Sequence, residues 1–140
     1  MKISGECFCK AISYESELDE NRIGICHCRD CQIISGSAFR MSSVVPVDDF
    51  NFTRGMPKFF DKRADSGSVR RLAFCDICGT HLCSLPVDND STSPFVSIRL
   101  STAREFLQLK PVSEIFCDSR VSWLAPLADS VQFSRMPTRS

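Results

Sequence analysis

The feature that most constrains this chain is the arrangement of its nine cysteines within 140 residues. Seven of them fall into three short patterns, Cys7-x-Cys9, Cys26-x-Cys28-x-x-Cys31 and Cys75-x-x-Cys78. Disulfides explain these patterns poorly, because an odd number leaves one thiol over and a bridge between residues i and i+2 would be strained. Clusters of this kind are more typical of metal binding in a reducing compartment.

The bulk composition is that of a globular protein whose length suits one domain over residues 1–140. Lys plus Arg and Asp plus Glu both number 17, so the formal net charge is zero. A neutral chain has no general attraction for nucleic acid or an anionic membrane. No apolar run approaches the roughly 20 residues that span a bilayer, and the opening MKISGECFCK lacks the apolar core of a signal peptide. We therefore expect a cytoplasmic protein.

Short alternating runs bounded by turn residues predict a mostly β fold. In the run FVSIRLS, Val96 and Ile98 share one face, while Ser97 and Arg99 lie on the other. The remaining runs lie at 11–16, 22–26, 37–47, 51–55, 57–63, 68–75, 80–87 and 113–119.

Helix is scarce in this sequence. The best candidate is 29–35, which Gly36 would end as a C-terminal cap. A second candidate is 102–109, with Thr102 as N-cap and Pro111 as the stop. The sequence therefore predicts at most one or two short helices, and its eleven phenylalanines, Phe59 and Phe60 among them, are expected in the core.

The cysteine spacing indicates which thiols can converge. Side chains at i and i+2 of an extended backbone share a face, so Cys7 and Cys9 point together. The same rule brings Cys26 and Cys28 together and turns His27 away from them. Cys75-x-x-Cys78 followed by glycine is typical of a metal-binding knuckle, in which a tight turn brings two sulfurs to one ion.

Seven patterned thiols divide economically into four and three. A closed tetrahedral zinc site takes four ligands, and a catalytic site typically takes three and leaves one position open. The simplest division places Cys7 and Cys9 on one ion with Cys75 and Cys78. The remaining three, Cys26, Cys28 and Cys31, then bind a second ion. Spacing alone leaves open a swapped pairing or a further ligand from His81, Cys83 or Cys117. Cysteine-only zinc is more often structural, so the residues alone favour two closed sites in an interaction module.

The chain resembles the glutathione-dependent formaldehyde-activating enzyme family, which is sometimes grouped with the centromere protein V family. The resemblance rests on GECFCKAISY (5–14), CHCRDCQIISGSAF (26–39), FCDICGTHL (74–82) and EIFCDSRVSW (114–123), in the family's order. It implies one zinc-stapled domain of the β-tent type that carries two zinc ions. Cys7, Cys9, Cys75 and Cys78 would then hold the structural zinc, and Cys26, Cys28 and Cys31 the catalytic zinc.

The first motif departs from the family at one position. Glycine usually follows its second cysteine, and here Lys10 stands there. If this position requires a positive φ, lysine costs on the order of 1 kcal/mol, which the binding of a structural zinc, worth roughly 10–16 kcal/mol, can absorb.

An open three-cysteine zinc is a mild Lewis acid, better matched to binding a substrate thiolate than to making hydroxide. The hypothesis is a carbon–sulfur lyase, similar to an S-(hydroxymethyl)glutathione synthase, that joins a small thiol such as glutathione to an aldehyde such as formaldehyde. The alternative is a non-catalytic zinc-stabilised module that binds protein or nucleic acid. The chain shows no basic extension that would favour this alternative, and SRMPTRS at its end carries only two arginines.

Substrate contacts are predicted at four positions, which are Gly36, Ser37, Arg120 and Trp123. The two loop residues would offer amides, and the arginine would meet a carboxylate of glutathione. Arg29, Arg40 and Arg99 are further candidates, although each of the four arginines is expected to be a solvated charge. His27 is expected off the metal at the edge of the core, His81 in an ordinary strand, and Cys83 and Cys117 as buried thiols. Core packing is the default expectation for Trp123.

Overall fold

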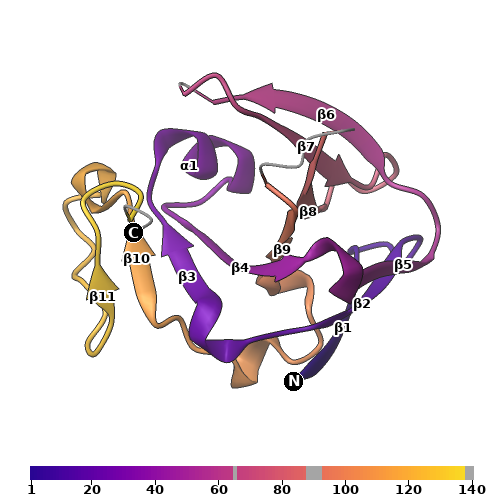
Figure 1. Ribbon diagram of the computed structural model, residues 1–140, viewed down its shortest axis with the longest axis horizontal. Coiled ribbons are helices and arrows are strands. Elements are labelled where there is room, and N and C mark those ends of the chain that lie inside the picture. Colours follow the sequence, from indigo (N-terminus) through magenta and orange to yellow (C-terminus); the bar gives the residue numbers. More distant parts are fainter. Residues whose placement is uncertain (65, 88–92, 138–140) are drawn as a thin grey trace.

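The computed structural model describes residues 1–64, 66–87 and 93–137. Within these residues the chain forms eleven strands, one α-helix and several 3-10 turns (Figure 1). The strands are β1 (Lys2–Glu6), β2 (Ser13–Glu17), β3 (Ile23–Cys26), β4 (Arg40–Pro46), β5 (Phe50–Arg54), β6 (Lys58–Arg63), β7 (Val69–Phe74), β8 (His81–Pro86), β9 (Phe95–Arg99), β10 (Ser113–Ile115) and β11 (Val131–Gln132). The helix α1 spans Arg29–Ser35, and the 3-10 turns are η1 (Glu20–Arg22), η2 (Val47–Asp49), η3 (Leu100–Thr102), η4 (Phe106–Gln108) and η5 (Cys117–Ser119). The predicted mostly β fold is confirmed.

The strands are arranged in two sheets. The smaller has the order β1-β2-β5, and the larger has the order β11-β10-β3-β4-β9-β8-β7-β6. Neighbouring strands are antiparallel, except that β10 runs parallel to both β3 and β11. This arrangement places a short strand from the C-terminal part of the chain directly beside the strand that leads to Cys26.

One face of the larger sheet packs against the smaller sheet and forms the hydrophobic core. Paired residues share a face, and Ser43 lies opposite both Ile23 and Ile98. Tyr14 and Phe50 approach this face from the smaller sheet, with their rings stacked at a centroid distance of 5.3 Å. The core residues of β4 and β9 therefore lie at alternate positions, as the alternation in the sequence predicts, whereas β8 contributes the consecutive residues Leu82 and Cys83.

The opposite face of the central strands carries a group of polar residues. Cys26 lies opposite Arg40, and Ser42 lies opposite Arg99. Ser84 and Ser97 are paired on the same face one strand further along. We call this set the polar face: Cys26, Arg40, Ser42, Ser84, Ser97 and Arg99. The polar face begins at Cys26, which ends β3. The group of Cys26, Cys28 and Cys31 therefore adjoins a surface of hydroxyl and guanidinium groups.

Each run that the sequence predicts as strand overlaps a strand, and the helix predicted over 29–35 has the predicted bounds. Gly36 ends this helix with φ of 66°, as the cap prediction requires. The strands β1 and β11 were not anticipated. Gly5 and polar residues interrupt β1, and β11 has only two residues, so neither carries a clear alternation.

The second predicted helix, over 102–109, is wrong. The segment instead forms the 3-10 turns η3 and η4. It lies alongside β1, where Arg104 N–H donates to Ser4 O at 2.8 Å and Ala103 forms a β-bridge with Gly5. Thr102 does not cap a helix, because its hydroxyl donates to Arg99 O and lies 2.8 Å from the hydroxyl of Tyr14. Tertiary hydrogen bonds have replaced a marginal local preference.

The prediction that all phenylalanines lie in the core is also wrong. Phe8 is 89% exposed, and Phe59 and Phe60 are 44% and 61% exposed. The last two belong to β6, which is the edge strand of the larger sheet and has few neighbours on either face. A guanidinium, that of Arg71, lies over the Phe59 ring at 5.8 Å.

Replacing Gly5 with alanine should destabilise the fold, because a Cβ there would lie 2.4 Å from the Tyr14 ring and 2.6 Å from Thr102 O. We expect Gly5→Ala to lower the free energy of unfolding by about 3 kcal/mol, measured by urea denaturation. Gly24→Ala is the matched control, since its Cβ would meet chiefly the rotatable hydroxyl of Ser113 at 2.9 Å. Equal losses in the two variants would contradict this packing argument.

Candidate metal centres

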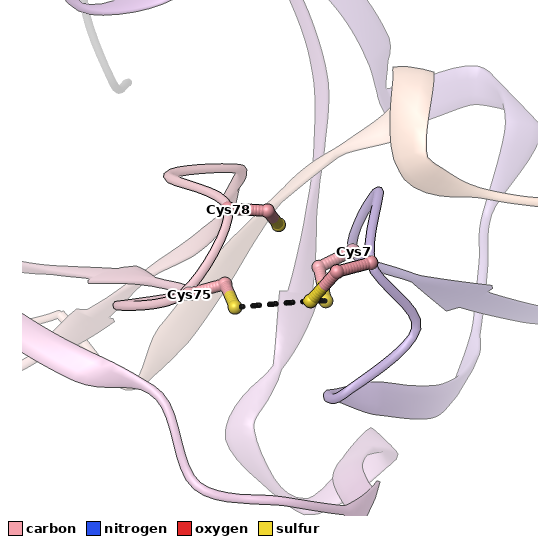
Figure 2. Close-up of side chains that lie close together, drawn as sticks. Cys7, Cys75 and Cys78 are labelled. Carbon is pink, nitrogen blue, oxygen red and sulfur yellow. Dashed lines mark hydrogen bonds between the residues drawn. The ribbon is translucent and has the colours of Figure 1, made fainter.

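Four cysteines from two distant parts of the chain meet in the first candidate centre. Cys7 and Cys9 follow β1, and Cys75 and Cys78 lie in the loop between β7 and β8. Their sulfur atoms all lie within 4.8 Å of one another. Figure 2 shows Cys7, Cys75 and Cys78 directed from their two loops toward one shared space. We call these four residues the quartet.

Tight backbone turns shape both loops of the quartet. Lys10 has φ of 68°, and its N–H donates to Cys7 O at 3.0 Å. Gly79 has φ of 78°, and its N–H donates to Cys75 O at 2.8 Å. The positive φ considered for Lys10 is confirmed, so lysine occupies a conformation that costs an L-residue about 1 kcal/mol.

The sulfur spacing of the quartet fits a closed tetrahedral ion. The Sγ atoms of Cys7 and Cys9 are 3.7 Å apart, as are those of Cys9 and Cys75. Four thiolates at the usual zinc–sulfur bond length would lie about 3.8 Å apart, whereas a disulfide needs about 2.0 Å. Thr80 joins the loops by accepting from Phe8 N–H at 3.1 Å and contacting Cys78 Sγ at 3.2 Å.

Three cysteines from one continuous stretch form the second candidate centre, which we call the trio. Cys26 ends β3, Cys28 is the N-cap of α1, and Cys31 lies in the first turn of that helix. Their sulfur atoms also lie within 4.8 Å of one another. Cys28 Sγ accepts a hydrogen bond from Cys31 N–H at 3.4 Å, so the helix start itself holds two of the three thiols together.

The three thiols of the trio differ in the direction of their pKa shifts. Hydrogen bonds from the thiols of Cys26 and Cys31 lower the pKa of Cys28 to about 2. The same contact with Cys28 raises the pKa of Cys26, and burial raises it further. Within residues 1–64, 66–87 and 93–137, no fourth His, Cys, Asp or Glu side chain joins this group. The trio therefore offers three sulfur donors and no fourth donor from the described side chains.

The additional ligands considered from the sequence lie outside both groups. Cys83 is buried in β8, and burial raises its pKa to about 12. Cys117 is only half-buried, contrary to prediction, and its Sγ donates toward Gln132 Oε1 at 3.3 Å. His81 begins β8 as expected, lies against the Phe74 ring at 5.6 Å, and has its pKa lowered by burial.

His27 lies between two cysteines of the trio but points away from it. The imidazole is fully buried rather than at the edge of the core, and its Nε2 lies 2.8 Å from Glu114 Oε1. The backbone N–H of His27 also donates to Ile115 O at 3.1 Å. The segment between Cys26 and Cys28 is therefore fixed by both main-chain and side-chain bonds to β10.

Glu114 is a residue of the candidate site's surroundings that sequence reasoning missed, and it bonds to His27 between two cysteines of the trio. Its carboxylate is 1% exposed and also accepts from Leu127 N–H at 3.0 Å, Ser130 Oγ at 3.2 Å and Gln132 Nε2. Burial alone would raise the pKa of Glu114, but these hydrogen bonds and that of His27 outweigh it and lower the pKa to about 2. A single acid in a three-residue strand leaves no sequence signal for such a network.

The arginines near the motifs differ in their surroundings. Arg29 is exposed, and Arg40 is half-buried on the polar face. Arg120 Nη2 donates to Cys117 Sγ at 3.2 Å and lies 3.5 Å from Glu114 Oε1. Arg99 is only 5% exposed, so the prediction of a solvated charge is wrong for it. Burial and the charge of Arg40 lower the pKa of Arg99 to about 9, which still leaves it protonated at neutral pH.

The other predicted substrate contacts lie at the ends of neighbouring elements. The amides of Gly36 and Ser37 donate to Ile33 O and Gln32 O at 3.3 Å, so both are already used by the helix end. A ligand contact here would fall to the exposed Ser37 hydroxyl. Trp123 is 75% exposed, so the expectation of core packing is wrong and its ring is available at the surface.

Two cysteine groups on a mostly β scaffold place the chain among small β proteins with cysteine sites that can hold metal. The model of the glutathione-dependent formaldehyde-activating enzyme family matches residues 2–119. The chain belongs to that family, and the suspected resemblance is confirmed.

Two individual proteins are similar to this chain. A protein of Schizosaccharomyces pombe described as an uncharacterized lyase is 32% identical over 78 residues. This alignment covers 56% of the chain and 53% of that protein, so the chain spans about half the length of this relative. The crystal structure of a Rhodobacter sphaeroides protein shares the fold, with a TM-score of 0.56, 16% identity, and coverage of 93% of this chain and 98% of the other.

Across the described part of the chain, no helix is long and apolar enough to cross a bilayer.

Removing the Glu114 charge should change how stability depends on pH. Because the folded pKa of about 2 lies below the ordinary 4.5, the ionised carboxylate stabilises the protein above pH 4.5, and this contribution is lost as the pH falls toward 2. We expect Glu114→Gln to be less stable by about 2 kcal/mol at pH 7, because an amide nitrogen would face donors. The difference in urea unfolding between the two proteins should shrink between pH 5 and pH 3, and a constant difference would contradict this assignment.

Proposed function

We propose that this protein is a zinc-dependent carbon–sulfur lyase that joins a small thiol to an aldehyde and reverses that addition. The observation that carries the proposal is the trio, in which three sulfur atoms lie within 4.8 Å and no fourth described side chain joins them. Membership of the family supports glutathione as the thiol and formaldehyde as the aldehyde. The name of the yeast relative supports lyase chemistry in general.

In this proposal the two cysteine groups hold two zinc ions with different tasks. The quartet would hold a closed structural ion, since four sulfurs complete a tetrahedron. The trio would hold the second ion. When bound, that ion would offer an open coordination position, where it would lower the pKa of an incoming thiol and hold the thiol sulfur. The free thiols that both sites need favour a reducing compartment such as the cytoplasm. Residues 1–140 would act as one domain, because the quartet ties its first strand to its middle.

The proposed reaction is a balanced addition. A bond forms between the thiol sulfur and the carbonyl carbon, and the π pair of the carbonyl moves to its oxygen. The proton lost by the thiol ends on that oxygen, so the product is a hemithioacetal and nothing is oxidised or reduced. The reverse reaction breaks the carbon–sulfur bond and returns the same proton.

The chain's own residues would contribute mainly position and charge. Cys28 at the helix start and Cys26 at the strand end fix two donors on elements that hydrogen bonds hold in place. His27 is a poor proton shuttle, because its ring is fully buried and its Nε2 is already bonded to Glu114. Ser37 and Trp123 remain the accessible candidates for contact with the body of a thiol substrate.

The proposal predicts different losses in Cys31→Ser and Cys78→Ser. We expect Cys78→Ser to unfold or precipitate, because the quartet joins distant loops and structural zinc contributes on the order of 10 kcal/mol in small domains. Cys31→Ser should stay folded, contain one zinc fewer, and lose thiol–aldehyde exchange measured with glutathione and formaldehyde. Circular dichroism and metal content per chain provide the controls.

Two outcomes would contradict the proposal. Equal loss of folding in both variants would remove the division between a structural and a catalytic group. A wild-type protein that binds two zinc ions but never catalyses thiol–aldehyde exchange would instead fit the alternative of a non-catalytic binding module.

A further inference from the structure

Two guanidinium groups beside the trio have no carboxylate partner in the described part of the chain. Arg99 is 5% exposed, and its Nη1 donates to Ser97 O and Ser97 Oγ at 3.3 Å and 3.1 Å. The Nε atoms of Arg99 and Arg40 are both buried without a hydrogen-bond partner. No ion pair within residues 1–64, 66–87 and 93–137 involves either residue. A buried cation without a counter-charge is costly, so a negative partner is expected nearby.

The register of the larger sheet places both arginines beside the trio. Arg40 of β4 lies opposite Cys26 of β3. Ser42, two residues after Arg40 and on the same face of β4, lies opposite Arg99 of β9. Cys26, Arg40 and Arg99 lie on one face of the adjacent strands β3, β4 and β9. The thiolates are thus the negative groups that these two cations face.

The charges suggest which state of the trio the arginines favour. Three thiolates around a divalent zinc carry one net negative charge, which matches only one of the two guanidinium groups. A fourth partner that is itself an anion brings the site to two negative charges, and the pair is then fully compensated. A neutral fourth partner leaves one positive charge uncompensated in a region of low dielectric.

We propose that Arg40 and Arg99 form a fixed cationic pair that makes the trio take its fourth partner as an anion, namely the thiolate of the substrate. This inference rests on the proposed function and specifies how the site selects its ligand. The pair acts through its field on sulfur rather than by gripping a carboxylate, because Arg99 is too deeply buried to meet a substrate group directly. It therefore predicts the same dependence for thiols with and without a carboxylate.

The test measures ligand binding to the Co²⁺-loaded protein through the visible absorption of its thiolate-bound metal. The probes are 2-mercaptoethanol, 3-mercaptopropionate and imidazole, and the variants are Arg99→Gln, Arg40→Gln and Arg99→Lys. The matched control is Arg29→Gln, which removes the same charge from an exposed position next to Cys28. The quartet provides an internal reference, since its absorption should not respond to any probe.

We expect Arg99→Gln and Arg40→Gln to bind both thiols on the order of tenfold more weakly, while their affinity for neutral imidazole stays unchanged. Arg99→Lys should recover most of the loss, and Arg29→Gln should stay within about twofold of wild type because exposed charges are screened. If Arg99→Gln fails to fold, the half-exposed Arg40 gives the same test.

Several results would overturn the inference. A loss confined to 3-mercaptopropionate would mean that the arginines bind a carboxylate. An equal loss for imidazole, an equal loss in Arg29→Gln, or unchanged affinity in both glutamine variants would each remove the role of the pair. A wild-type protein whose spectrum responds to neither thiol would instead refute the proposed function itself, and this inference with it.

Discussion

The convergence of four thiols from two distant loops is the constraint on which the rest of the structure depends. Cys7 and Cys75 are 1% and 0% exposed, and both belong to the hydrophobic core as well as to the quartet. The quartet therefore joins the smaller sheet, through the end of β1, to the β7–β8 loop of the larger sheet. Because a small domain buries limited apolar surface, a metal held here would supply stability that the core alone lacks. The strain of Lys10 at a positive φ is tolerable in a loop fixed in this way.

The sequence was most informative where local geometry decides the structure. Alternation located the central strands, and Gly36 located the end of α1, because each depends on residues only a few positions apart. The i, i+2 periodicity of an extended backbone likewise predicts, without any tertiary contact, that Cys26 and Cys28 point in the same direction. Prediction failed where distant contacts decide. The 102–109 segment forms turns because it bonds to β1, and Phe59 is exposed because its strand lies at the edge of the sheet.

The candidate site shows the same division. All seven patterned cysteines could be selected from spacing, and the structure brings them together as four and three. The groups around the trio could not be selected in this way. Glu114 meets His27 across 87 positions of sequence, and the burial of Arg99 follows from its central place in an eight-stranded sheet. Spacing therefore identifies the cysteines that could hold a metal, whereas the charged side chains around them are placed by strand order and register.

The two faces of the larger sheet differ in chemical character. On the core face, apolar residues of β3, β4 and β9 pack against the smaller sheet. On the polar face, hydroxyl and guanidinium groups occupy the alternate positions of the same strands. Burying that polarity costs free energy that a purely structural sheet would avoid by using apolar side chains on both faces. A chain that retains Arg99 in such a position needs a compensating negative charge, and in our proposal the thiolates of the trio at the end of the polar face would supply it.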